Sequence, residues 1–149
     1  MEMENQFRLE EVGEIEVMKQ ALPVLQELYP TLCLAHYTSL LAQMVPHNYK
    51  QILVFHENRV VAVCGFWIGT KIWCGKYLEL DNVIVSKDFR SHDIGKRMTR
   101  YLIDKAKKED CNMLGLDVYT DNYRGIKFYM NEGFIPRGFH MINVLKGNY

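Results

Sequence analysis

The sequence has no excess of charge of either sign, because 18 lysines and arginines balance 18 aspartates and glutamates. A protein dedicated to nucleic-acid binding normally carries a basic excess, so we expect no nucleic-acid partner. Disorder of the whole chain requires low hydrophobicity and high net charge, whereas 48% of these residues are hydrophobic. The composition therefore predicts a folded, globular protein.

Long apolar runs are also missing. The best of them, Val60–Ile68, falls far short of the ~20 residues that a membrane-spanning helix requires. Met1–Glu10 is acidic, where a signal peptide has a basic start and an apolar core. We therefore expect no membrane partner and a cytoplasmic location. The cysteines form no Cys-x-x-Cys pair and have no histidine at metal-ligand spacing, which predicts free thiols and no bound metal.

The hydrophobic pattern alternates between strands and helices, without repeats, low-complexity segments or linkers. Apolar residues at helical spacing predict helices over four segments: Ile15–Leu28 with a break or kink at Pro23, Leu34 to Pro46, Ile94–Glu109 and Gly125–Glu132. Runs rich in β-branched and aromatic residues predict strands over Phe7–Glu11, Gln51–His56, Val60–Ile68, Tyr77–Val85, Met113–Tyr119 and Phe139–Leu145. We expect one domain over residues 1–149, of the α/β or α+β class with a mixed sheet.

The segment Val83–Lys96 has the chemistry of a binding site. A strand runs through a polar loop into the strongest predicted helix, whose first turn presents unpaired N–H groups and the positive end of the helix dipole. Such a turn is suited to phosphate. Gly95 would let an anion approach the backbone, and Arg90, Lys96 and Arg97 add positive charge. The alternative interpretation is an ordinary helix start, capped by a side chain and followed by a solvated basic face.

A second segment, Asn122–Phe134, follows a strand and predicts a short helix that Gly133 ends. It carries two adjacent aromatic residues, Phe128 and Tyr129. Aromatic side chains at such positions are commonly part of a hydrophobic core. Taken alone, the segment leaves a core role and a functional role open.

Together, and in this order, the two segments resemble the GNAT superfamily of N-acetyltransferases. The acyl-CoA motif of that family, Arg/Gln-x-x-Gly-x-Gly/Ala, corresponds to Arg90-Ser91-His92-Asp93-Ile94-Gly95, with Asp93 in place of the first glycine. The second signature, Asn-x-x-small-x-x-Phe-Tyr-x-x-x-Gly-Phe, corresponds without a gap to Asn122, Gly125, Phe128, Tyr129, Gly133 and Phe134. Aspartate adopts left-handed backbone more readily than most residues, so we expect the turn at Asp93 to form with its side chain facing solvent.

The resemblance implies a mixed, mostly antiparallel sheet of about six or seven strands flanked by about four helices. In the family, the strand corresponding to Tyr77–Val85 is bulged and splays from the strand corresponding to Met113–Tyr119. The gap accepts the pantetheine arm of acetyl-CoA, the acetyl donor, and a backbone N–H polarises the acyl carbonyl. The cofactor-binding residues implied here are Val83, Ile84, Val85, Arg90, Ser91, His92, Asp93, Ile94, Gly95, Lys96, Asn122 and Lys127.

The resemblance also implies a reaction, the direct attack of a primary amine on the thioester. Glu79 and Asp81 are two residues apart on a predicted strand and so share one face. They are the candidate bases, acting directly or through water, and Glu79 is the first choice. The alternative is that both are solvated surface carboxylates. Tyr129 corresponds to the general acid that protonates the departing thiolate.

The acceptor is expected to be a small-molecule or peptide amine, because the uncharged, aromatic segment Leu28–Tyr49 would wall its site together with Arg137–Leu145. That segment equally suits packing on the sheet or a dimer contact. The chain is expected to act as a monomer or a homodimer. An alternative function is a non-catalytic or regulatory acyl-CoA-binding module that acts through protein contacts. Transfer of a longer acyl group also remains open.

Overall fold

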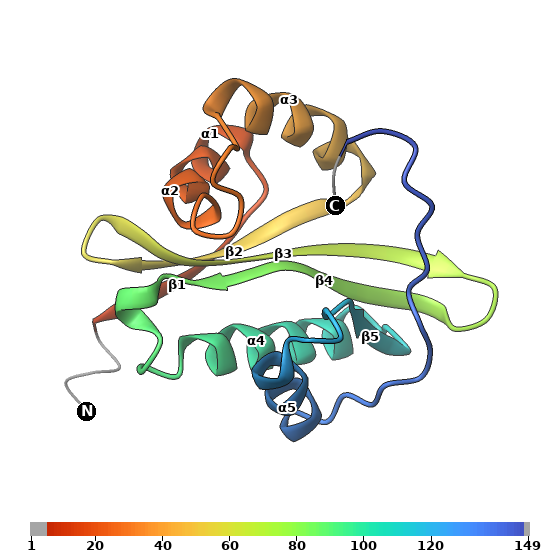
Figure 1. Ribbon diagram of the computed structural model, residues 1–149. Coiled ribbons are helices and arrows are strands. Elements are labelled where there is room, and N and C mark those ends of the chain that lie inside the picture. Colours follow the sequence, from red (N-terminus) through yellow and green to blue (C-terminus); the bar gives the residue numbers. More distant parts are fainter. Residues whose placement is uncertain (1–5, 148–149) are drawn as a thin grey trace. The chain divides into compact units, whose positions relative to one another are not determined.

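The structure is a computed structural model that describes residues 6–147. The chain divides into two compact units, which meet in the sequence between Leu116 and Asp117. The first unit is built on a five-stranded sheet with the order β1-β2-β3-β4-β5 (Figure 1). Its strands are β1 (Phe7–Val12), β2 (Tyr49–His56), β3 (Arg59–Lys71), β4 (Gly75–Val85) and β5 (Met113–Leu116).

Neighbouring strands of this sheet pair antiparallel, except that β4 and β5 pair parallel. The expected α/β class with a mixed, mostly antiparallel sheet is thus confirmed, but with five strands in the described residues instead of six or seven. The hairpin between β2 and β3 turns at Glu57, whose φ is 57°. β5 ends at Leu116, three residues before the predicted end of that strand.

Helices lie on both faces of the sheet (Figure 1). One face carries α1 (Ile15–Met18), α2 (Leu22–Leu25) and α3 (Leu34–Met44). The predicted break near Pro23 is confirmed, because a 3₁₀ turn, η1 (Lys19–Ala21), separates α1 from α2 and places the proline in the first turn of α2. Proline is tolerated there since the first N–H groups of a helix have no intrahelical partner. A second 3₁₀ turn, η2 (Val45–His47), contains Pro46 and ends α3.

The opposite face carries α4 (Ile94–Lys108), which packs against β3 and β4. Its buried residues Ile94, Met98, Leu102 and Ala106 recur at steps of four, so they form the single stripe that the sequence predicts. Each large side chain of this kind stabilises the fold by about 1.5–3 kcal/mol when it is buried. This stripe fixes the direction of α4 and therefore the place of its first turn.

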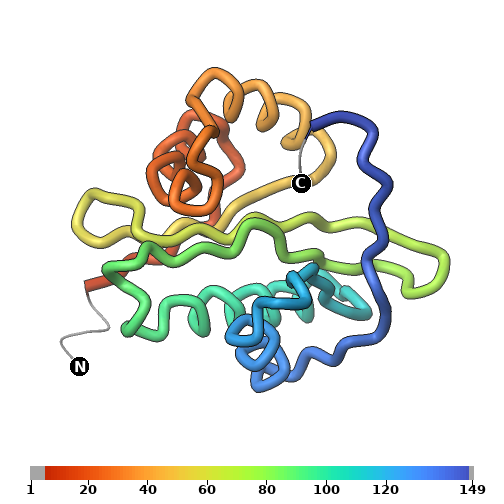
Figure 2. Tube along the Cα trace, in the orientation of Figure 1, coloured from red at the N-terminus to blue at the C-terminus, as the bar shows by residue number. Residues whose placement is uncertain are grey.

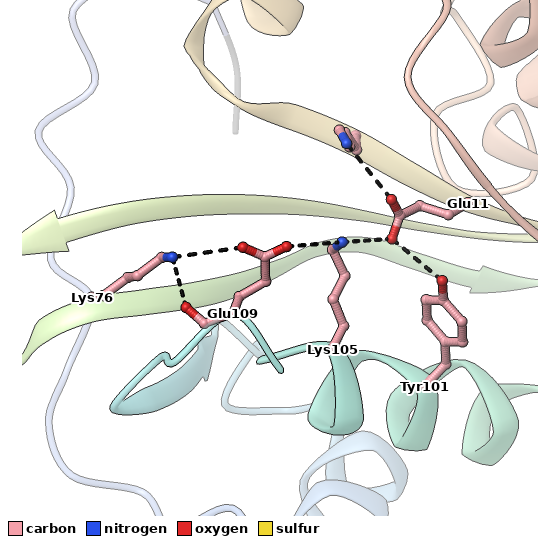
Figure 3. A network of polar contacts seen from close by, with 6 residues as sticks. Glu11, Lys76, Tyr101, Lys105 and Glu109 are labelled. Atoms are coloured by element: carbon pink, nitrogen blue, oxygen red, sulfur yellow. Dashed lines mark hydrogen bonds and ion pairs between the residues drawn. The ribbon is translucent and has the colours of Figure 1, made fainter. Parts of the chain in front are cut away.

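A polar network fixes the other end of α4 to the sheet (Figure 3). Lys105 Nζ lies 2.9 Å from Glu11 Oε1 on β1 and 3.7 Å from Glu109 Oε1. The Tyr101 hydroxyl donates to the same Glu11 oxygen at 3.4 Å, and Lys76 Nζ donates to the Glu109 carbonyl at 2.6 Å. Burial alone would lower the pKa of Lys105, but the hydrogen bond and charge of Glu11 and the charge of Glu109 raise it above its ordinary value.

The second unit contains α5 (Tyr123–Asn131), which ends before Gly133 with its φ of 98°. The predicted strand Phe139–Leu145 is wrong, because these residues have no regular structure. Phe139, Met141 and Leu145 are each at least 88% exposed. A β-rich run becomes a strand only when a neighbouring strand supplies backbone partners, and the described residues of this unit, 117–147, include no strand.

Candidate functional site

A bulge interrupts β4 in its second half. Val63 on β3 pairs with Ile84 and Gly65 pairs with Asp81, so the single residue between the two β3 positions faces two residues, Asn82 and Val83, on β4. Asn82 has a φ of 53°. Asparagine is one of the few residues that adopt this left-handed conformation readily. The trace of β4 bends accordingly between its two halves (Figure 2).

The pairing of β4 with β5 ends just before this bulge. The last pair of the parallel ladder is Leu80 with Leu116, whereas β4 continues to Val85 while it pairs with β3 alone. The expected bulge in this strand is therefore confirmed, whereas its splay from Met113–Tyr119 stays a prediction, because residues 117–119 belong to the second unit. One backbone edge of residues 81–85 has no strand beside it within the part of the chain that the structure describes.

The loop after β4 leads through a 3₁₀ turn, η3 (Lys87–Phe89), into the first turn of α4. Asp93 precedes α4 with φ 55° and ψ 22°, and its side chain makes no capping hydrogen bond. This backbone conformation favours glycine, which gives a physical reason for the glycine of the family motif. Asp93 is exposed, so its side chain is placed as expected, and the turn forms.

The first turn of α4 has backbone N–H groups that no intrahelical carbonyl accepts. The Arg97 N–H donates to the Asp93 carbonyl, but Ile94, Gly95 and Lys96 precede the first intrahelical hydrogen bond. Because no side chain caps the helix, the interpretation as an ordinary capped start is not supported. Arg97 contributes less to this site than its sequence position indicates, since its guanidinium donates to the Phe7 carbonyl at 3.5 Å. Arg90 Nε donates to the Val85 carbonyl at 3.3 Å.

Glu79 and Asp81 lie on one face of the sheet, as predicted, because Glu79 pairs with Trp67 and Asp81 pairs with Gly65 on β3. Their surroundings differ. Trp67 Nε1 donates to Asp81 Oδ2 at 3.0 Å, which fixes that carboxylate. The Glu79 carboxylate lies over β5, where a Cβ added to Gly115 would come within 2.5 Å of Glu79 Oε2. Glycine at position 115 is thus what permits this position of Glu79.

The Trp67 ring rests on a buried group of hydrogen-bonded side chains, Tyr49, Gln51 and Tyr37. The Trp67 ring packs on Tyr49 with 4.8 Å between ring centroids. Gln51 Nε2 donates to the Tyr49 hydroxyl at 3.1 Å and to the Tyr37 hydroxyl at 2.9 Å, and the Tyr37 hydroxyl donates to the Met18 carbonyl at 3.0 Å. Burial raises the pKa of Tyr37 to about 12 and raises that of Tyr49 further. Both phenols therefore stay neutral and act as fixed hydrogen-bonding groups.

The second unit holds the remaining predicted site residues. Asn122 Oδ1 accepts the Gly125 N–H at 3.0 Å, so this side chain caps α5. Tyr129 is half-buried, and its ring meets those of Phe128 and Phe134 edge to face at 5.1 and 5.6 Å. The Phe134 N–H donates to the Tyr129 carbonyl at 3.0 Å. These contacts fix the backbone and ring of Tyr129, while Lys127 is exposed.

Sequence reasoning from the residues did not find three features of this site. Asn82 could have been found, because Asp-Asn in the middle of an apolar strand is a β-poor pair typical of a bulge. The contact between Trp67 and Asp81 gives no sequence signal, since the two residues are 14 apart on different strands. Gly115 beneath Glu79 gives none either, because only the register of β4 and β5 brings them together.

Within residues 6–147, no cluster of three or more histidine, cysteine, aspartate or glutamate side chains is arranged to hold a metal ion. All four cysteines are free thiols. No helix of the described chain has the length and apolar character to cross a membrane.

Known protein structures share this fold. The fold is similar to that of glucosamine-6-phosphate N-acetyltransferase from Arabidopsis thaliana, with a TM-score of 0.75 and 19% identity, covering 94% of this chain and 99% of that one. It is also similar to an aminoglycoside acetyltransferase from an uncultured soil metagenomic sample in complex with sisomicin, with a TM-score of 0.79 and 12% identity, covering 97% and 99%.

An aminoglycoside N-acetyltransferase in complex with CoA gives a TM-score of 0.77 at 11% identity and covers 95% of both chains. At these identities the likeness is one of fold. No curated protein matches the sequence significantly. Residues 15–134, however, match the acetyltransferase (GNAT) family. The match includes the β4 bulge, the first turn of α4 and α5, and the chain belongs to the GNAT acetyltransferase family.

Proposed function

We propose that the chain is an acetyl-CoA-dependent N-acetyltransferase that moves an acetyl group to a primary amine of a small molecule or peptide. The observation that carries the proposal is the end of β4: the ladder to β5 stops at Leu80, a bulge follows at Asn82, and an uncapped helix start lies beyond it. Residues 1–149 are proposed to form one such domain, since the family match runs through both units.

The acetyl donor fits the residues of this strand end and helix start. Backbone groups of Val83 and Val85 would pair with the pantetheine amides, and an N–H at Ile84 would polarise the acyl carbonyl. The pyrophosphate would take the N–H groups between Ser91 and Lys96, where the helix dipole favours negative charge. Asn122 and Lys127 are proposed to contact the cofactor, Asn122 in addition to its capping role.

The proposed transfer needs one base and one acid. The amine nitrogen attacks the thioester carbon, the carbon–sulfur bond breaks, and the electron pair stays on sulfur. The amine proton passes to Glu79, directly or through water, and the Tyr129 hydroxyl gives its proton to the thiolate. Glu79 is the first candidate because the family resemblance favours this position, and its carboxylate lies over Gly115 of β5. Asp81 is then proposed to hold Trp67 and to add negative charge beside the amine.

The first unit offers one candidate wall for the acceptor, the uncharged segment Leu28–Tyr49. Within it, Tyr37 and Leu41 of α3 are buried in the hydrophobic core, while His36 stays exposed. Since this segment contains no aspartate or glutamate, a small amine or a peptide amine suits it better than a polycation. The location proposed for this activity is the cytoplasm.

A calorimetric titration with acetyl-CoA, followed by thiol-release assays with a panel of amines, tests the proposal. We expect one-to-one binding at about micromolar affinity, an energy of about −8 kcal/mol, and release of free CoA with at least one class of amine. Binding without transfer to any amine would favour the alternative function, an acyl-CoA-binding module acting through protein contacts. Absence of binding at millimolar acetyl-CoA would overturn both.

A further inference from the structure

The turn after α2 places two side chains against the bulged end of β4. The Asn82 side-chain amide donates to the Tyr29 hydroxyl at 3.0 Å, and the backbone N–H of Lys87 donates to Glu27 Oε1 at 3.0 Å. Asn82 is the left-handed residue of the bulge, and Lys87 is the first residue of η3. Two side chains from one short turn therefore hold both ends of the stretch between bulge and loop.

The turn that carries Glu27 and Tyr29 is itself rigidly built. The Tyr29 N–H donates to the Leu25 carbonyl at 2.8 Å, and Leu25 is buried in the core between the helices and the sheet. The Leu32 N–H donates back to the Tyr29 carbonyl at 3.0 Å, and Gln26 Nε2 donates to the Leu32 carbonyl at 2.8 Å. These hydrogen bonds hold the turn in one conformation, so Glu27 and Tyr29 contact β4 from fixed backbone positions.

Charge strengthens the contact at Glu27. Burial alone would raise the pKa of this carboxyl, but hydrogen bonds from the Lys87 N–H and the Ser86 hydroxyl, with the charges of Arg90 and Lys87, hold the pKa below its ordinary value. Glu27 is thus ionised at neutral pH. Since Arg90 also donates to the Val85 carbonyl, the attraction between Glu27 and Arg90 extends the support to the last residue of β4.

We propose that Glu27 and Tyr29 are positioning residues for the acetyl donor, which hold residues 82–87 in the conformation that the donor requires. This inference rests on the proposed function. Residues 82–87 need such support because the ladder between β4 and β5 ends at Leu80. Beyond Leu80, no strand of the described chain pairs with this edge of β4. A non-glycine residue in left-handed backbone persists only when its surroundings fix it, and the Tyr29 hydroxyl is the side-chain group that the structure places on Asn82.

Tyr29→Phe tests the first contact, because it removes the hydroxyl and keeps the ring. We expect the NMR resonances of the Asn82 side-chain amide to shift and CoA to bind about threefold to tenfold more weakly in calorimetry. Tyr101→Phe is the matched control, since Tyr101 is 39% exposed against 41% for Tyr29 and loses a hydrogen bond far along α4. Equal CoA affinity in Tyr29→Phe and the wild type would overturn the role of Tyr29.

A double-mutant cycle separates positioning from general loss of stability. Asn82→Gly keeps the left-handed backbone accessible but removes the amide donor. If both residues act through their shared hydrogen bond, Tyr29→Phe combined with Asn82→Gly weakens CoA binding no more than the larger single change. Fully additive effects would overturn the coupling.

The role of Glu27 can be measured at one backbone amide, the Lys87 N–H that donates to its carboxylate. In Glu27→Ala we expect hydrogen exchange of the Lys87 N–H to accelerate and CoA binding to weaken, whereas Glu27→Gln retains an acceptor oxygen and restores part of both. Glu16→Ala is the control, because Glu16 is an exposed glutamate whose carboxylate pairs with Lys19, three residues along the chain. Unchanged exchange at Lys87 in Glu27→Ala would overturn the role of Glu27.

The measurements also distinguish this inference from the proposed function. NMR and hydrogen exchange of the free protein report on residues 82–87 without any ligand. If the wild type failed to bind CoA, the proposed function and with it the donor role would be overturned. If the wild type bound CoA while the variants at positions 27 and 29 bound it equally well, the positioning role alone would be overturned.

Discussion

We predict that Gly115→Ala displaces the Glu79 carboxylate while it leaves the stability of the fold nearly unchanged. The added Cβ would lie 2.5 Å from Glu79 Oε2, whereas ordinary contact begins near 3.4 Å, so the carboxylate must move by about 1 Å. The displaced atom is the end of a flexible side chain, and the other near neighbour, Met113 Cε, is at 3.5 Å. Because only a side-chain end must move, we expect the free energy of unfolding to change by less than about 1 kcal/mol.

The effect on turnover is expected to be much larger. A misplacement of about 1 Å in a catalytic group lowers a rate by about 100-fold, equivalent to about 2.7 kcal/mol in the barrier. We therefore predict that Gly115→Ala lowers kcat in a thiol-release assay while the Kd for acetyl-CoA stays the same. Gly13→Ala is the control, since its Cβ would meet only Lys50 Cε at 3.8 Å. An unchanged kcat in Gly115→Ala, or an equal loss in Gly13→Ala, would refute the reasoning.

Four further predictions concern protons, charge and the donor site. Glu79→Gln should move the pH profile of kcat/KM toward alkaline values, because the amine must lose its proton unaided; an unmoved profile would assign the base to Asp81 or water. Tyr129→Phe should lower kcat with little change in the calorimetric Kd for acetyl-CoA, and an equal kcat would remove Tyr129 as the acid. Asp93→Gly should tighten CoA binding about threefold, since it removes a negative charge beside the phosphate site and suits the left-handed backbone; weaker binding would contradict that. Denaturant titrations across pH test Lys105, whose pKa is raised in the folded state. Its charge therefore adds fully to the free energy of unfolding below the unfolded-state pKa of about 10.4, and this addition is lost as pH rises through the folded-state pKa. Glu11→Gln should reduce that loss, and an identical pH dependence would exclude the ion pair as its cause.

Local patterns in the sequence predicted the elements whose partners are close or whose signals are strong. The four-residue apolar spacing of α4 and the proline at position 46 predicted that helix and the end of α3. Runs rich in β-branched and aromatic residues predicted β2, β3 and β4, and the two-residue spacing of Glu79 and Asp81 placed both carboxylates on one face. The strand predicted over Phe139–Leu145 is wrong because such a run reports β propensity and not the presence of a partner strand.

By itself, the sequence determined the order of the main helices and strands from β1 to α5, the family and the residue types of the candidate site, because these depend on periodicity and on motifs of short spacing. Tertiary structure alone decided the different surroundings of the Asp81 and Glu79 carboxylates. Trp67 Nε1 donates a hydrogen bond to Asp81, and the missing side chain of Gly115 leaves space for Glu79. Tertiary structure alone also brought Tyr29 and Glu27 to residues that are 53 and 60 positions away in the sequence. Such contacts follow from strand register and from the packing of α2 on the sheet, which no local pattern encodes.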